Sequence, residues 1–123
     1  MRNYKEQTLQ EWCADFLNRL PILYCASAGG VRTSIGTAVK MKRAGYKKGF
    51  PDIFIYEPRL GYKGLAIELK SGSRPTVEQK EWQRELIMKG YAALIMPSNM
   101  ELQEAITWFK DAVSNYLNGG VVK

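Results

Sequence analysis

Two short apolar runs, separated by a turn that contains glycine, constrain the fold of this chain most. Residues 53–56 (IFIY) and 65–69 (LAIEL) have the length and the β-branched or aromatic content of strands, and the turn EPRLG follows the first run. If the two runs pair as a hairpin centred near Leu60, equal steps outward from that centre place Asp52 opposite Glu68. The sequence therefore predicts two carboxylates a few ångströms apart on one face of a sheet.

Side chains alternate along a strand, so Glu68 and Lys70 point to one face while Ile67 and Leu69 point to the core. Two carboxylates about 4 Å apart repel by roughly 4 kcal/mol at an effective dielectric near 20, and a divalent cation removes that repulsion. Oxygen ligands suit a hard ion such as Mg²⁺ or Mn²⁺. Protonated Lys70 is not a ligand and is left to orient a water or steady a phosphate. The alternative is an ordinary hairpin with a cross-strand Glu and Lys.

Length and composition narrow the possible functions. The chain has 123 residues, of which 46% are hydrophobic, which predicts a single domain over residues 1–123. No signal peptide and no membrane span is visible, so we expect a soluble cytoplasmic protein without a membrane partner. The sequence lacks histidine, which excludes Ser-His-Asp and Cys-His chemistry. We expect the two cysteines, Cys13 and Cys25, to be reduced and buried.

The net charge of +6 favours a polyanionic partner, and its distribution is uneven. No acidic residue occurs between residues 16 and 51, immediately before the Asp52 strand. The alternative is a solvated basic helix and loop. The residues predicted to contact DNA are Arg32, Lys40, Lys42, Arg43, Lys47, Lys48 and Arg74.

Two residues have both a structural and a functional interpretation. Glu6 lies at the edge of the apolar stripe of a helix predicted over residues 5–19, where it either attracts a cation or complements the helix dipole. The segment TVEQ at residues 76–79 has the form of a capping box that starts a helix reaching about residue 89. Gln79 either completes that cap or faces the carboxylates, and the sequence leaves both interpretations open.

The remaining segments complete an α/β pattern. We expect a strand or buried loop at residues 22–25, a short helix at 34–44, a basic turn between glycines at 45–49, an interior strand at 91–96, and a last helix whose apolar side forms core or a dimer contact. Residues 118–123 are expected to fray. This order of elements predicts an α/β layer with a mixed sheet flanked by helices.

Five ordered motifs resemble one nuclease family. They are EQTLQ at residues 6–10, GGVR at 29–32, GFPD at 49–52, IELKS at 67–71 and TVEQ at 76–79. Together they are similar to the PD-(D/E)xK nuclease superfamily, and specifically to its VRR-NUC (virus-type replication-repair nuclease) branch. The similarity runs from about residue 6 to residue 96.

The resemblance implies a restriction-endonuclease-like core and metal-dependent hydrolysis of DNA to 5′-phosphate ends. It implies that Asp52 and Glu68 bind Mg²⁺ or Mn²⁺ with help from the Leu69 carbonyl, that Lys70 positions or activates the attacking water, and that Glu6 and Gln79 complete the site. Stand-alone viral and bacterial members of similar length resemble homodimeric nucleases of four-way junctions. A flap or nicking nuclease, and a catalytically silent DNA-binding module on the same fold, are the alternatives.

Overall fold

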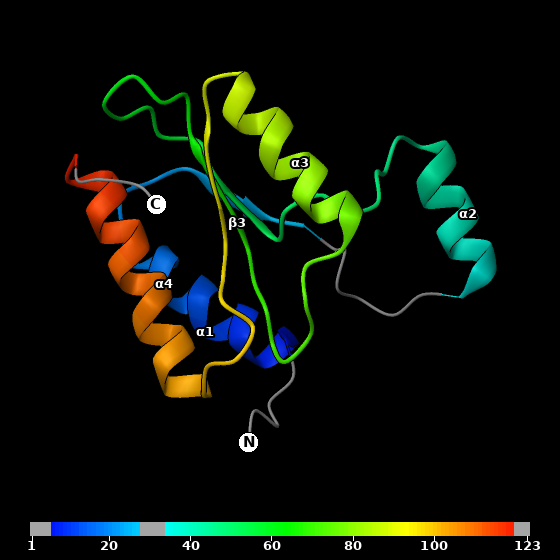
Figure 1. The fold of residues 1–123 in the computed structure, drawn as a ribbon, viewed down its shortest axis with the longest axis horizontal. Helices are drawn as coiled ribbons and strands as arrows, with labels where there is room; N and C mark the ends of the chain where they lie inside the picture. The colour runs from blue at the N-terminus through cyan, green and yellow to red at the C-terminus, as the bar shows by residue number, and fades with distance from the viewer. Residues whose placement is uncertain (1–5, 28–33, 120–123) are drawn as a thin grey trace.

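The computed structural model describes residues 6–27 and 34–119, and the side chains of residues 6 and 7 lie outside the described part. Helices and strands alternate along the chain except at β2 and β3, which follow each other directly (Figure 1). In order, they are α1 (Glu6–Asn18), β1 (Tyr24–Ala26), α2 (Ile35–Arg43), β2 (Ile53–Ile55), β3 (Leu65–Glu68), α3 (Val77–Met88), β4 (Ala92–Ile95) and α4 (Leu102–Leu117). None of these helices has the length and apolar character needed to cross a bilayer.

The strands form one mixed sheet in the order β1-β2-β3-β4. The β1–β2 and β2–β3 pairs are antiparallel, while β3 and β4 are parallel. In the β2–β3 hairpin, Ile53 pairs with Ile67 and Ile55 pairs with Leu65, which is the register predicted from a centre at Leu60. Leu60 and Gly61 both have positive φ, 47° and 82°, and reverse the chain there. The predicted α/β fold with a mixed sheet is confirmed.

Helices cover both faces of the sheet. On one face, α1 and α4 pack against the inward side chains of β2, β3 and β4, and Phe16 meets Phe109 edge to face with ring centroids 6.4 Å apart. On the other face, α3 covers a smaller cluster formed by Phe54, Ala66, Leu86 and Ala93. The side of β3 that carries Glu68 is therefore not a bare solvent face but lies under α3.

The strand predicted at residues 91–96 is present as β4, but its predicted interior position is wrong. In the part of the chain that the structure describes, β4 pairs with β3 and lies at the edge of the sheet. Its unbroken apolar sequence has a different cause, because α3 packs on one side of β4 and α4 on the other. A strand that is buried on both faces is apolar throughout even at a sheet edge.

The prediction of two buried cysteines holds for Cys13 but is wrong for Cys25, which is exposed. Cys25 lies on β1, the other edge strand, opposite Phe54. Its side chain therefore points to the same side of the sheet as α3, but the cluster under α3 draws its strand residues from β2, β3 and β4 and includes none from β1. The sequence alone does not reveal how far a covering helix extends.

Helix α2 forms where a short helix is predicted, with Ser34 as its N-cap: the Ser34 hydroxyl accepts a hydrogen bond from the Thr37 backbone. No residue of α2 is buried, and the helix stands away from the sheet and the other helices (Figure 1). Ile35 is 86% exposed and Val39 is 51% exposed. Packing against the core does not hold α2 in place.

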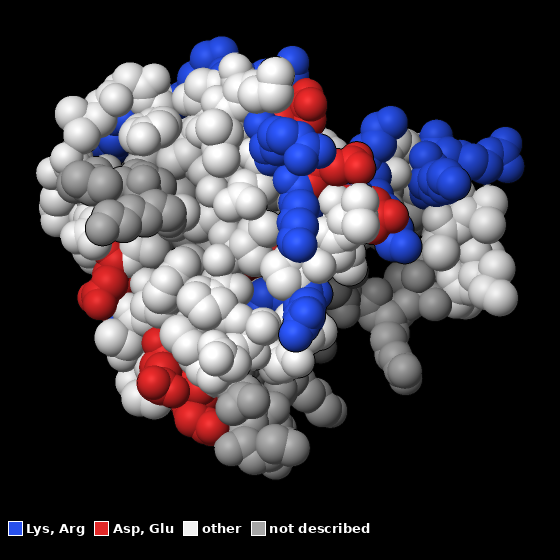
Figure 2. Space-filling model, in the orientation of Figure 1, with Lys and Arg blue, Asp and Glu red and all other residues white. Residues whose placement is uncertain are grey.

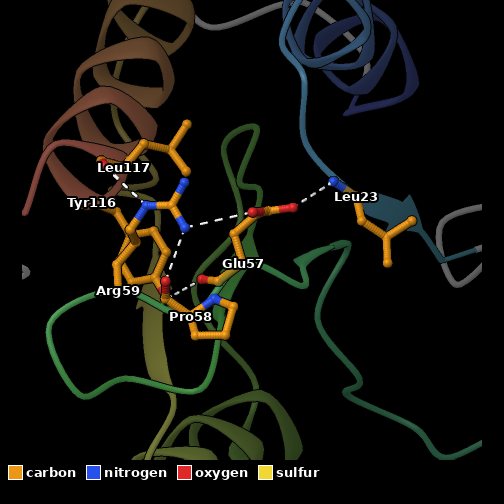
Figure 3. Close-up of polar contacts among 6 residues, drawn as sticks. All are labelled: Leu23, Glu57, Pro58, Arg59, Tyr116 and Leu117. Carbon is orange, nitrogen blue, oxygen red and sulfur yellow. Dashed lines mark hydrogen bonds and ion pairs between the residues drawn. The ribbon is translucent and has the colours of Figure 1, made fainter.

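The far end of the β2–β3 hairpin is tied to distant parts of the chain (Figure 3). The Tyr116 hydroxyl donates to the Glu57 carbonyl over 2.6 Å, and Arg59 Nε donates to the Leu117 carbonyl over 3.1 Å. The Glu57 carboxylate accepts from the Leu23 backbone at 2.9 Å. Residues next to β1, the hairpin and the end of α4 thus meet in one polar network.

Candidate active site

Asp52 and Glu68 lie side by side at the open end of the hairpin. The register of β2 and β3 continues by one residue to set them opposite each other, and their carboxyl groups are close enough to hydrogen-bond. Asp52 Oδ2 also accepts from the Leu69 backbone N–H at 2.8 Å. Asp52 is only 7% exposed and Glu68 only 6% exposed. The predicted carboxylate pair is therefore present, and it is buried.

Burial raises the pKa of Asp52 above its ordinary value, because removal from water disfavours the charged form. The Leu69 N–H, the hydrogen bond with Glu68 and the charge of Lys70 oppose this rise without cancelling it. Burial and the Asp52 charge also raise the pKa of Cys13 on α1 to about 12. The Cys13 thiol is thus kept protonated and unreactive beside the carboxylates.

Lys70 and Gln79 complete the cluster. Lys70 is only 3% exposed, and its ammonium group donates to Gln79 Oε1 over 2.6 Å and to the Arg74 carbonyl over 3.5 Å. The other end of the same amide, Gln79 Nε2, donates to Glu68 Oε2 over 2.8 Å. Gln79 therefore joins the buried cation to one of the buried carboxylates.

The capping box predicted for α3 is confirmed, and it uses the same residue. The Thr76 hydroxyl accepts from the Gln79 backbone, while Gln79 Oε1 accepts from the Thr76 backbone at 2.9 Å. The two interpretations of Gln79 are both correct, because an amide carries two donor hydrogens and an oxygen that accepts twice. Closing the cap fixes the rotamer that reaches Lys70 and Glu68.

Gly49 allows the segment before Asp52 to approach the first turn of α3. A Cβ at this position would lie 2.7 Å from both the backbone carbon and the Cβ of Glu78, and Gly49 has φ of +88°. Gly45, the other glycine of the basic turn, has φ of +105° with nothing within 4 Å of the same construction. Of the two glycines, Gly49 is the one pressed against a neighbour, and that neighbour is the helix that carries Gln79.

The donor set fits a hard divalent cation. Asp52 and Glu68 supply adjacent carboxylate oxygens, and the raised pKa of Asp52 reflects how poorly this buried position tolerates negative charge without compensation. Among the described residues, no three His, Cys, Asp or Glu side chains come together as metal ligands. The Leu69 carbonyl and Glu6 are the further ligands expected from the sequence. Glu6 begins α1, but its side chain lies outside the described part.

Most residues predicted to contact DNA lie on or next to α2. Lys40, Lys42 and Arg43 form its last turn, and Lys47 and Lys48 follow in the turn that leads to Gly49. Figure 2 shows Lys and Arg side chains gathered around this projecting helix, with more of them over α3. On the face shown, basic side chains thus concentrate over α2 and α3, here called the basic side of the molecule, with acidic side chains among those over α3.

The other two residues predicted to contact DNA are Arg32 and Arg74. Arg32 and the rest of the GGVR turn lie outside the described residues. Arg74 has an additional role that the sequence did not reveal, since its backbone carbonyl receives Lys70. Pro75 was the signal in the sequence, because a proline favours an extended conformation for the residue before it. The carbonyl of an extended residue outside a helix or strand is available to accept a hydrogen bond.

A solved structure described as a VRR_NUC domain protein is similar to this chain. The two share 26% sequence identity, and the likeness covers 98% of this chain and 93% of the other with a TM-score of 0.73. No family model and no curated protein matches the sequence. The likeness in three dimensions thus extends over nearly the whole of both chains.

Proposed function

We propose, from its fold and its motifs, that this chain is a nuclease of the VRR-NUC family and that it hydrolyses phosphodiester bonds in DNA with the help of Mg²⁺ or Mn²⁺. One observation carries the proposal: Asp52 and Glu68 are buried side by side while Gln79 connects Glu68 to Lys70. A protein that only bound DNA would gain nothing from placing two carboxylates near a polyanion. The cluster therefore favours catalysis over silent binding.

The carboxylates of Asp52 and Glu68 would hold the cation, with the Leu69 carbonyl and Glu6 as the further ligands. When bound, the cation would polarise the scissile phosphate and lower the pKa of an attacking water. The hydrogen bond from the Leu69 N–H to Asp52 keeps that carboxylate oriented toward its partner on β3. The hydrogen bond from Gln79 does the same for Glu68.

Lys70 would act on the water or on the charge that develops on the phosphate. Its ammonium group is held by the Gln79 side chain and the Arg74 carbonyl, so little reorganisation is needed when substrate arrives. Gln79 is a positioning residue in this scheme, because it contacts Lys70 and Glu68 and not the substrate. Both groups that it positions belong to β3 or its immediate continuation.

We propose that the substrate is branched DNA, a four-way junction first of all, and that the enzyme works as a homodimer. The basic side of the molecule supports contact with the phosphate backbone, and two-fold symmetry would supply two active sites for paired cuts. A flap or nicking nuclease is the second candidate. Contacts to phosphates alone do not distinguish these substrates.

Cleavage of labelled junction, flap, single-stranded and linear duplex DNA in Mg²⁺, Mn²⁺ or EDTA tests the proposal. The parent should cut the junction in a metal-dependent manner, and Asp52→Asn should lower the rate by about 100-fold or more while DNA binding persists. Asp111→Asn, a change of the same type at an exposed position on α4, should leave the rate unchanged. No cutting of any substrate with either metal would overturn the assignment.

A further inference from the structure

Helix α3 has two exposed flanks of opposite charge. Lys80 and Arg84, one helical turn apart, lie on the flank beside β4. Glu78, Glu81 and Glu85 lie on the opposite flank, where they outnumber the two lysines, Lys48 and Lys89, that line the same separate hollow of about 340 Å³. One helix thus separates a basic surface from an acidic one.

The basic flank forms one wall of a groove of about 670 Å³ between α3 and β4. Apolar side chains, including Ile87, line the rest of that wall, and Ile95 of β4 lies opposite. A second hollow of about 440 Å³ shares Gln83 and Ile87 with the first, so the depression continues along the length of β4.

The groove begins at the active site. Pro75 lines its near end, directly after Arg74, whose carbonyl accepts from Lys70. Lys80 follows Gln79 in the first turns of α3. A DNA strand that extends from Asp52 and Glu68 along the groove would therefore bring its phosphates past Arg74, Lys80 and Arg84 in that order.

The strand edge beneath this groove is partly closed. Ala92 and Met96 donate their N–H groups toward β3, which leaves the polar groups of Ala93 at the outer edge of β4. Gln83 Nε2 of α3 donates to the Ala93 carbonyl over 3.1 Å. This contact disfavours a peptide that would bind by adding a strand to β4, whereas a nucleic acid does not need the strand edge.

We infer that this groove binds the backbone of an unpaired DNA strand next to the active site. The inference rests on the proposed nuclease function and adds a second DNA-binding surface to the one around α2. A volume of about 670 Å³ lies in the range of pockets for small ligands, which suits a few nucleotides of a single strand and not a duplex. Glu78, Glu81 and Glu85 lie between the groove and the α2 turn, so DNA held at α2 and DNA held in the groove follow separate paths.

The test compares Lys80→Glu/Arg84→Glu with a control double variant of equal charge change, Arg19→Glu/Lys110→Glu. Arg19 and Lys110 are exposed and belong to the α1 and α4 side of the sheet. Affinities for a blunt duplex and for the same duplex with a single-stranded tail are measured in EDTA by fluorescence anisotropy over a range of salt. Circular dichroism and thermal unfolding establish that each variant is folded.

We expect the parent and the control to bind the tailed duplex better than the blunt one. The groove variant should lose that preference, with affinity for the tailed DNA falling roughly tenfold and the slope of log affinity against log salt falling by about 1.4 for two lost single-strand contacts. The neutral variant Lys80→Gln/Arg84→Gln should show the same change of slope. It serves as the test if charge reversal unfolds α3.

Equal binding of the tailed duplex by the groove variants and the control would overturn the inference. That result is also expected if the groove instead receives an acidic peptide. Metal-dependent cleavage of branched DNA by the parent is measured separately. If the parent cuts DNA and the groove variants bind as the control does, DNA binding by the groove is refuted and the nuclease assignment stays intact.

Discussion

Gln79 links the start of a helix to the centre of the candidate active site. Its oxygen accepts from both Thr76 and Lys70, and its nitrogen donates to Glu68. The sequence presents the cap and the site as alternatives, because a capping box fully explains a glutamine at this position. They coincide in three dimensions because β3 ends beside the first turn of α3, and the local pattern does not contain that information.

Replacing Gln79 should therefore affect catalysis more than stability. We expect Gln79→Ala to lower kcat by about 10- to 100-fold with little change in DNA affinity, because Lys70 and Glu68 lose the group that orients them. The matched control is Thr76→Ala, which removes the cap hydrogen bond and destabilises the protein by about 1 kcal/mol without touching Lys70. Single-turnover cleavage and equilibrium binding are the measurements. A similar loss of kcat in Thr76→Ala would mean that Gln79 acts only through the helix.

The raised pKa of Asp52 predicts how the metal-free protein responds to pH. The stability that this carboxyl contributes is present below the usual pKa of 3.8 and is lost as the pH rises through the higher pKa of the folded state. In EDTA at neutral pH, Asp52→Asn should thus be more stable than the parent, and the difference in stability should shrink toward pH 4.

Thermal unfolding of both proteins between pH 4 and 8 measures this difference. Addition of Mg²⁺ should raise the Tm of the parent and leave that of Asp52→Asn nearly unchanged, because a cation bound to the folded state alone stabilises it. Asp111→Asn serves again as the exposed control. A parent that is as stable as Asp52→Asn at neutral pH in EDTA would show that the buried carboxylate is not destabilising.

At the scale of elements, the contact between Gly49 and α3 sets how closely the β2 segment approaches the helix. Gly45 and Gly49 look alike in the sequence, where each flanks the predicted basic turn. Only the folded structure separates them, because the atoms that crowd Gly49 belong to Glu78 and Gln79. By contrast, the hairpin register was predictable, since it depends on neighbouring residues and a turn centre at Leu60.

The two glycines give a matched pair of substitutions. Gly45→Ala should incur only the cost of a positive φ, about 1 kcal/mol, whereas Gly49→Ala adds a steric clash that costs a further 1–3 kcal/mol or so. Because the clash pushes α3 away from the carboxylates, Gly49→Ala should also reduce cleavage. Chemical denaturation and the cleavage assay measure both effects. Equal losses of stability in the two variants would contradict a role for the close approach.

At the scale of the whole molecule, the structure separates acidic and basic side chains that are mixed along the sequence. The acid-free stretch from residue 16 to residue 51 was visible, and the structure places much of it on the projecting α2. The two flanks of α3 were not recognised, because Lys80 and Arg84 alternate along the chain with Glu81 and Glu85. Their separation has meaning only once β4 is known to lie beside one flank and the α2 turn beside the other.

The polar network at the far end of the hairpin cannot form until the last turn of α4 has been synthesised. Glu57 and Arg59 leave the ribosome long before Tyr116 and Leu117, the residues to which they are tied. A nascent chain can form the β2–β3 hairpin early, but its closed end stays untied until the last turn of α4 has been translated. The hairpin that carries Asp52 and Glu68 is therefore tied down at its closed end only after the last turn of α4 has been translated.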